Sequence, residues 1–217
     1  VHNYYKQRGG EDESFDAEAA LLESHGHEVQ KYTRHNDSID QRSKAKVALE
    51  TFWNRQSQRD IAKILSEFDA DVMHATNLFP LISPSIYKAA NLAGVPVVQS
   101  LRNYRHFCVN SFLHRDGKIC ERCLDKKIAL SGVTKVCYKN SVMGSAVLTA
   151  HNSYHRFWKT WEQRVDRFFT PTEFARQKYI QASFDGDKIA VKPNFLTPDP
   201  GLSSHRREFA LFVGRLA

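Results

Sequence analysis

The strongest constraint on the fold lies between residues 95 and 137. A short apolar run, Val95–Leu101, is rich in β-branched residues and has no charged ones, as in a parallel strand buried on both faces. It leads directly into Arg102-Asn103-Tyr104-Arg105, a polar and cationic segment that opens a long loop. Because ligands of open α/β sheets bind at the carboxyl ends of the strands, we expect this segment to lie at a binding site.

The rest of the chain alternates between patterns typical of strands and patterns typical of helices. Residues 1–5 read as the end of a strand, and a turn at Gly9-Gly10 precedes a helix that ends at Gly26. The apolar side of that helix is predicted to carry Phe15, Ala19, Leu21 and Leu22. Further strands are predicted at 28–33, 71–75, 96–101, 167–170 and 188–192, and further helices at 84–93 and 172–182. Residues 44–68 are predicted to form one or two helices, with an interruption around 54–58. The alternation predicts an α/β fold with a doubly wound, Rossmann-like parallel sheet.

The longest helical pattern runs from Met143 to Val165. Apolar side chains repeat there at steps of three and four residues, and the second half combines aromatic with basic residues. Such a face is compatible with a membrane interface, but aromatic stripes at this spacing more often pack into a core, and we predict the core arrangement. His151 and His155 are one helical turn apart with no third ligand nearby, so we predict a structural role for them.

The charge balance indicates the class of partner. The chain of 217 residues has a formal net charge of +7, which favours anionic partners such as phosphorylated ligands, nucleic acid or acidic lipid, or else reflects a dispersed basic surface. No apolar run reaches the roughly 18 residues of a membrane span, and no charged-then-apolar leader begins the chain. We therefore expect a cytoplasmic protein, with peripheral contact at the inner face of the membrane as a variant of that expectation.

The C-terminal end changes in composition. Residues 197–208 are rich in Pro, Ser, Gly and charge, as linkers are, and residues 209–217 read as an apolar strand ending in Gly214-Arg215. We expect a first domain at 1–196 with a cysteine-rich loop at 102–137. A linker at 197–208 and the start of a truncated second domain at 209–217 complete the predicted organisation.

All four cysteines fall in or next to that loop. Cys120 and Cys123 form a knuckle of the kind that binds zinc, with eleven residues between Cys108 and Cys120 and thirteen between Cys123 and Cys137. A structural zinc ion held by these four thiolates is the favoured interpretation, because a long loop needs a constraint to be ordered. Free thiols are the main alternative, disulfides are disfavoured in a reducing compartment, and an iron–sulfur cluster also fits the ligands.

Several strings match one known family in order over nearly the whole chain. They are His2–Tyr5 with Gly9-Gly10-Glu11, His25–Val29, Pro96–Val98 with Leu101–Arg105, Val165–Phe168 with Pro171–Ala175, Lys188-Ile189 with Pro193–Phe195, and Phe212–Leu216. Together they resemble the N-terminal half of retaining, nucleotide-sugar-dependent glycosyltransferases of family 4. That family has the GT-B architecture, in which two doubly wound domains face each other across a cleft.

The resemblance implies an acceptor-binding half whose missing partner domain holds most of the nucleotide-sugar donor. It implies that Gly9-Gly10 lies near the donor phosphates and that Arg215 contacts the donor diphosphate. A guanidinium suits that role because it binds phosphate oxygens in pairs. The substrate-binding residues that it implies are Gly9, Gly10, Glu11, Asn103, Tyr104, Arg105, Glu173 and Arg215.

Arg102 occupies the position at which most of this family has a histidine, so it is the candidate catalytic residue and also the main departure. A guanidinium cannot accept a proton at physiological pH. We therefore expect Arg102 to contact a donor or acceptor phosphate, with a surface ion pair to a nearby carboxylate as the alternative.

Two functions of different classes follow. The favoured one is the acceptor-binding half of a glycosyltransferase that moves a sugar to a glycan or lipid-linked acceptor in cell-envelope polysaccharide biosynthesis, inactive as this fragment. The alternative is a non-enzymatic zinc module whose basic surface binds nucleic acid or another anionic partner, although the cations do not cluster on one helix with aromatic platforms. A dinucleotide-dependent oxidoreductase is excluded because the fingerprint of three spaced glycines is missing.

Overall fold

The computed structural model describes residues 1–197, 201, 208, 210 and 212. Its centre is a parallel sheet in the order β3-β4-β7-β8, formed by Met73–Ala75, Val97–Ser100, Arg167–Thr170 and Ile189–Val191. A second parallel pair, β1 (His2–Tyr4) with β2 (Thr33–His35), continues this sheet beside β3. The Val1 amino group donates to the His74 carbonyl at 2.7 Å, and the Asn3 N–H donates to the Asn77 carbonyl at 2.7 Å. The predicted α/β class with a doubly wound parallel sheet is confirmed.

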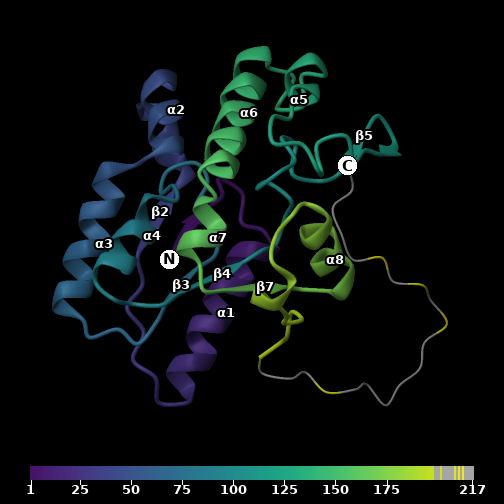
Figure 1. Cartoon of the computed structure of the whole chain (residues 1–217). Helices are drawn as coiled ribbons and strands as arrows, with labels where there is room; N and C mark the ends of the chain where they lie inside the picture. The colour runs from purple at the N-terminus through teal and green to yellow at the C-terminus, as the bar shows by residue number, and fades with distance from the viewer. Residues whose placement is uncertain (198–200, 202–207, 209, 211, 213–217) are drawn as a thin grey trace.

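Helices connect these strands (Figure 1). The α-helices are α1 (Gly10–Ser24), α2 (Lys44–Phe52), α3 (Arg55–Glu67), α4 (Ser85–Leu92), α5 (Ser131–Thr134), α6 (Val142–Phe157), α7 (Thr160–Arg164) and α8 (Glu173–Gln181). Two 3₁₀ helices lie at Asn36–Gln41 and Gly186–Lys188, and the cysteine-rich loop forms a hairpin of β5 (His114–Arg115) and β6 (Lys118–Ile119). None of the helices in the described residues combines the length and the apolar character needed to cross a membrane.

The core lies between the sheet and its helices. Ile82, Ile86 and Tyr87 from the region of α4 are 0–1% exposed and join Val97 of β4 and Trp161 of α7 in one cluster. Burying side chains of this size contributes about 1.5–3 kcal/mol each before the cost of ordering the chain. The cluster also includes Leu101 and Phe107, so the first part of the loop after β4 is fixed by packing.

The sequence patterns misplaced some elements. The predicted strand at 28–33 is wrong in its position, because only Thr33–His35 pair with β1. The interruption predicted within 44–68 is confirmed at Trp53-Asn54, where the Asn54 side chain caps α3 by accepting from the Ser57 N–H. Leu22 is exposed, although Phe15 and Ala19 are buried as predicted and Gly26 ends the turn with φ +85°.

The largest error concerns the predicted apolar face of the long helix at 143–165, of which only the end, with Trp161 and Val165, is buried as predicted. Lys159 adopts a left-handed conformation with φ +47° and divides the pattern into α6 and α7. The buried side of α6 consists of Ser145, Leu148, Thr149, His151, Asn152 and His155, whereas Met143, Tyr154 and Phe157 face solvent. Polar side chains occupy the inner face because they find partners there: His155 Nδ1 lies 3.0 Å from Thr160 Oγ1, and the Asn152 amide donates to the Arg105 carbonyl.

Candidate functional site

A cleft of about 1050 Å³ opens at the carboxyl edge of the sheet. The turn after β1 lines it with Gly9, Gly10 and Glu11, and the loop after β4 lines it with Arg102, Asn103 and Arg105. Phe79 and Pro80 come from the segment after β3, Pro171 from that after β7 and Asn194 from that after β8. Segments that are far apart in the sequence therefore meet where ligands of open α/β sheets bind.

The buried Asp12 side chain fixes the Gly9-Gly10 turn. Gly9 is the N-cap of α1, and its N–H donates to Asp12 Oδ2 at 2.9 Å. The other oxygen of Asp12 lies 2.7 Å from His2 Nε2, and both side chains are fully buried. Burial lowers the pKa of His2, and the hydrogen bond to Asp12 opposes that shift. Strand β1 thus fixes the turn that forms one wall of the cleft.

Glu11 joins the two walls of the cleft. Its Oε1 accepts a hydrogen bond from the Asn103 amide at 2.8 Å, and its Oε2 accepts one from the Tyr5 hydroxyl at 3.0 Å. Burial, followed by the charge of Glu11, raises the pKa of Tyr5, so the phenol stays protonated and continues to donate. The carboxylate lies beside the start of α1, where the helix dipole stabilises negative charge.

Arg102 reaches from the cleft to a buried carboxylate. Its guanidinium donates to Glu18 of α1 and to the Asn194 side chain, and Lys192 donates to the same Glu18 oxygen. The side chains of Arg102 and Glu18 are only 11% and 9% exposed. Arg102 therefore forms an ion pair with a nearby carboxylate, which was the alternative expectation for this residue. Contact of Arg102 with a substrate phosphate stays a prediction. The sequence did not single out Glu18, whose only signal was its position three residues after Phe15 on the inner side of α1.

Arg105 differs from Arg102 because none of the ion pairs found among the described residues includes it. Its guanidinium carbon lies 4.3 Å from the centre of the Phe79 ring, and Nη2 has one long contact of 3.4 Å with Ser111 Oγ. Nε and Nη1 are buried and have no hydrogen-bond partner in the part of the chain that the structure describes. Two buried guanidinium nitrogens without an acceptor are costly, which makes Arg105 the cleft cation best suited to receive an anion.

A smaller, mostly apolar cavity of about 70 Å³ adjoins the cleft and shares Glu11, Arg102, Asn103 and Arg105 with it. His106 and His151 line its inner side. Burial lowers the pKa of His106 to about 3 and that of His151 to about 4, with the charge of Arg105 acting in the same direction. These imidazoles are therefore neutral at physiological pH and can accept hydrogen bonds.

Comparison with known proteins identifies the family of this chain. A family model described as a glycosyl transferase 4-like domain matches residues 9–194, from the Gly9-Gly10 turn to the end of the sheet. The chain belongs to this family. Neither the curated proteins nor the solved structures include a match. Membership supports a sugar-transferring enzyme, whose substrates are a sugar donor and an acceptor.

Two further candidate residues of this glycosyl transferase 4-like domain, Tyr104 and Glu173, do not line the cleft. The Tyr104 ring packs on Phe107 and Tyr179, with centroids 5.8 and 6.1 Å apart. Glu173 is exposed and accepts hydrogen bonds from Gln177 and Arg176 of its own helix, which lower its pKa in that order. Pro171, rather than Glu173, lines the cleft. Arg215, together with most of 198–217, lies outside the described residues.

The four cysteines of the glycosyl transferase 4-like domain are free thiols in the structure. Cys108 Sγ donates to Asn110 Oδ1 and Cys123 Sγ lies 3.0 Å from Ser131 Oγ. Burial raises the pKa of Cys137, and the other three thiols add to the rise, so the four groups act on one another electrostatically. No group of three or more His, Cys, Asp and Glu side chains in the described residues is arranged to hold a metal ion. The four-thiolate zinc site therefore stays a prediction.

Metal analysis tests the zinc prediction. Protein purified without added zinc is expected to contain about one zinc per chain, bound by Cys108, Cys120, Cys123 and Cys137. Replacing Cys120 with Ser should release the metal and expose residues 110–135 to proteases while the sheet stays folded. Finding no metal, together with four thiols that react freely with a small reagent, would contradict it.

Proposed function

We propose that this chain is the acceptor-side half of a glycosyltransferase that moves a sugar from a nucleotide-sugar donor to a glycan or lipid-linked acceptor. A second domain, beginning near residue 209, completes the cleft and binds most of the donor. The enzyme acts in the cytoplasm, at or near the inner face of the membrane, in cell-envelope polysaccharide biosynthesis. The observation that carries the proposal is the contact of Glu11 with Asn103, which brings the Gly9-Gly10 turn and the loop after β4 together in one cleft.

The chemistry of the cleft suits a polyhydroxylated substrate with an anionic group. Glu11 is a carboxylate that accepts hydrogen bonds from sugar hydroxyls, and it is held in place from both sides by Tyr5 and Asn103. Arg105 supplies positive charge without a carboxylate partner, and guanidinium groups bind phosphate oxygens strongly. Gly9 and Gly10 leave the backbone open to close approach by a ligand.

Arg102 has a positioning role in this proposal. By pairing with Glu18 it ties the end of β4 to α1, the helix whose first residues line the cleft. Lys192, which follows β8, binds the same carboxylate. The anion-binding role passes to Arg105, because the Arg102 guanidinium is already engaged with Glu18 and Asn194.

Replacing Arg105 with Gln in the complete enzyme is expected to lower kcat/KM by about 10- to 100-fold. A hydrogen bond to a charged group contributes about 1.5–3 kcal/mol, and the amide keeps much of the side-chain volume while removing the charge. Steady-state kinetics with varied donor and varied acceptor will show which substrate carries the anion.

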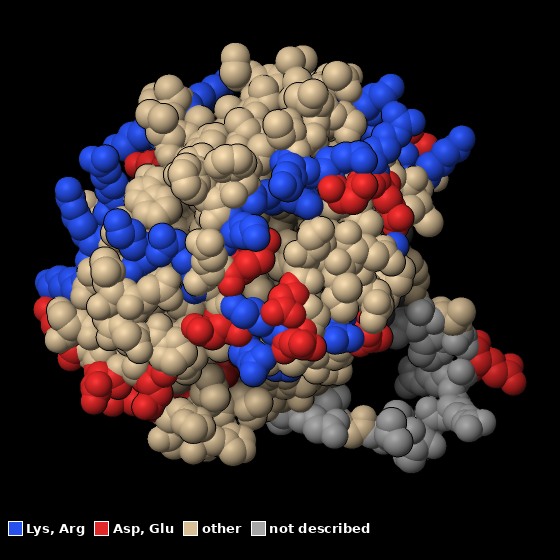
Figure 2. Space-filling model, in the orientation of Figure 1, with Lys and Arg blue, Asp and Glu red and all other residues tan. Residues whose placement is uncertain are grey.

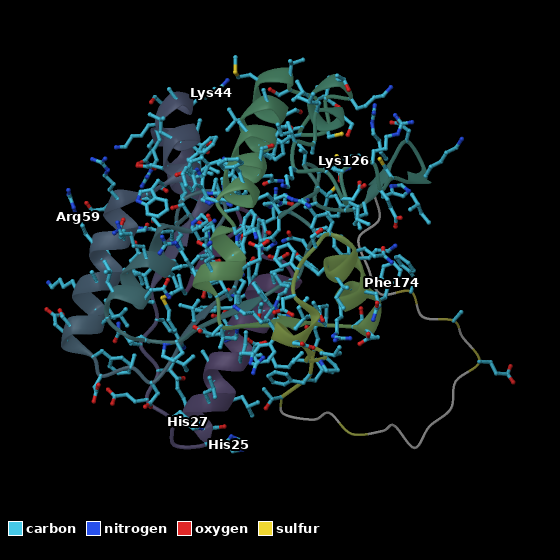
Figure 3. The ribbon with its side chains drawn as sticks, in the orientation of Figure 1. His25, His27, Lys44, Arg59, Lys126 and Phe174 are labelled. Atoms are coloured by element: carbon cyan, nitrogen blue, oxygen red, sulfur yellow. The ribbon has the colours of Figure 1, made fainter. Side chains whose placement is uncertain are left out.

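The matched control is Arg59→Gln. Arg59 is an exposed arginine at the outer side of α3 (Figure 3) and does not line the cleft. It should leave kcat/KM unchanged. Equal kinetics for the two variants would remove Arg105 from the site.

A further inference from the structure

Helix α6 carries an apolar stripe on its solvent side. The α6 stripe consists of Val142, Met143, Ala150, Tyr154 and Phe157, and it continues into Trp158 just after the helix. Met143 is 74% exposed, Phe157 71% and Trp158 59%. Large apolar side chains gathered on one exposed helix face indicate an interaction surface, because isolated ones are the rule elsewhere.

The surroundings of the stripe are cationic. Between residues 126 and 161 the chain has six Lys and Arg side chains and no Asp or Glu. Arg156 is turned inward, where it donates to the carbonyls of Leu124 and Ala182. The five lysines are all exposed: Lys126, Lys127, Lys135, Lys139 and Lys159. Lys126 pairs at the surface with Asp125, just outside this range.

The elements next to α6 also expose apolar and cationic side chains. Leu49 of α2 and Ile128 and Leu130 beside α5 are exposed, and both helices pack against α6. Lys44 of α2 and Lys126 lie on either side of α6 in Figure 3. Figure 2 shows uncharged surface over this region bordered by Lys and Arg side chains, while most of the visible Asp and Glu lie lower on the molecule.

We propose that the α6 stripe and its lysines dock on the surface of an anionic lipid bilayer. Aromatic and apolar side chains enter the boundary between headgroups and acyl chains, and the lysines bind the acidic headgroups. A second copy of the chain fits poorly, because a symmetric contact would bring the two lysine sets together. Lys139, three residues before the first residue of the stripe, lines the cleft, so the stripe begins close to the cleft. This deepens the proposed function by placing a lipid-linked acceptor at the cleft mouth.

Vesicle sedimentation without any sugar substrate tests the proposal on this chain. We expect binding to phosphatidylglycerol-containing vesicles that weakens as salt is raised, and much weaker binding to phosphatidylcholine alone. The double variant Phe157→Ser with Trp158→Ser should lower the partition coefficient at least about 10-fold. The double variant Lys127→Gln with Lys159→Gln should lower it about 10- to 30-fold on anionic vesicles only.

Leu92→Ser and Arg59→Gln are the matched controls, since Leu92 is 76% exposed on α4 and Arg59 is exposed on α3. Both should bind as the parent does. Unchanged binding after the Phe157 and Trp158 replacements would overturn the proposal, as would a concentration-dependent dimer that buries the stripe without vesicle binding. Lipid binding is measured apart from transfer, so transfer to a water-soluble acceptor in a protein that fails to bind vesicles would leave the proposed function standing.

Discussion

Replacing Glu18 with Ala is expected to cost about 3–5 kcal/mol of the free energy of unfolding. Glu18 accepts hydrogen bonds from both Arg102 and Lys192 and is nearly buried, so its loss leaves two cations close together without a carboxylate. His74, whose ring lies 3.8 Å from the same carboxylate, adds no third positive charge, because burial lowers its pKa to about 4 and keeps the ring neutral. Urea unfolding of this chain measures the effect.

Glu13→Ala is the control from the same helix. Glu13 pairs with Arg8 at the surface, where the two side chains are 65% and 55% exposed, and such a pair contributes about 0–1 kcal/mol. If Glu18→Ala shifts the unfolding midpoint no more than Glu13→Ala does, the buried cluster does not anchor α1.

Acid is expected to unfold the domain well above the pH at which carboxylates protonate. Burial lowers the pKa of His74 to about 4, of His106 to about 3, of His151 to about 4 and of His155 to about 2. In the unfolded chain these groups titrate near 6.5. As the pH falls from about 6.5 toward 4, the unfolded state takes up protons that the folded state does not, so stability falls.

The size of the acid effect follows from proton linkage. Each histidine contributes a slope of about 1.4 kcal/mol per pH unit, so four of them remove about 5–8 kcal/mol between pH 7 and pH 5. Unfolding free energies from urea titrations at several pH values give the slope. His155→Gln should reduce the slope by about one proton, whereas His27→Gln, an exposed residue in the turn after α1, should not. A slope of zero between pH 7 and 5 would contradict the assignment of buried, neutral imidazoles.

Local patterns predicted the sheet and the loops at its carboxyl edge well, because parallel strands and helix ends are encoded by neighbouring residues. The run Val97–Ser100 and the turn at Gly9 are examples. The partners of the site residues were not predictable in this way. Glu18 and Arg102 are 84 residues apart, and the helix pattern on α1 does not reveal which cation its inner carboxylate will meet.

The orientation of α6 could not be predicted from the sequence pattern either. Apolar periodicity alone cannot distinguish a face that packs on the core from one that meets a different partner. On α6 the polar face is the buried one, because His151, Asn152 and His155 find hydrogen-bond partners inside the domain. Tyr154, Phe157 and Trp158, which the sequence pattern placed in the core, are exposed, whereas Trp161 of α7 is buried as predicted.

Transfer of a labelled sugar from nucleotide-sugar donors is the most direct test of the proposed acceptor-side role. The protein in which a donor-binding domain follows residue 217 is compared with this chain alone, each with glycan and lipid-linked acceptors. We expect the two-domain protein to transfer sugar to the acceptor. We expect this chain alone to give no transfer above the background hydrolysis of the donor. Equal transfer by this chain alone, or no transfer by the two-domain protein from any nucleotide sugar, would contradict the assignment of this domain as the acceptor half of a glycosyltransferase.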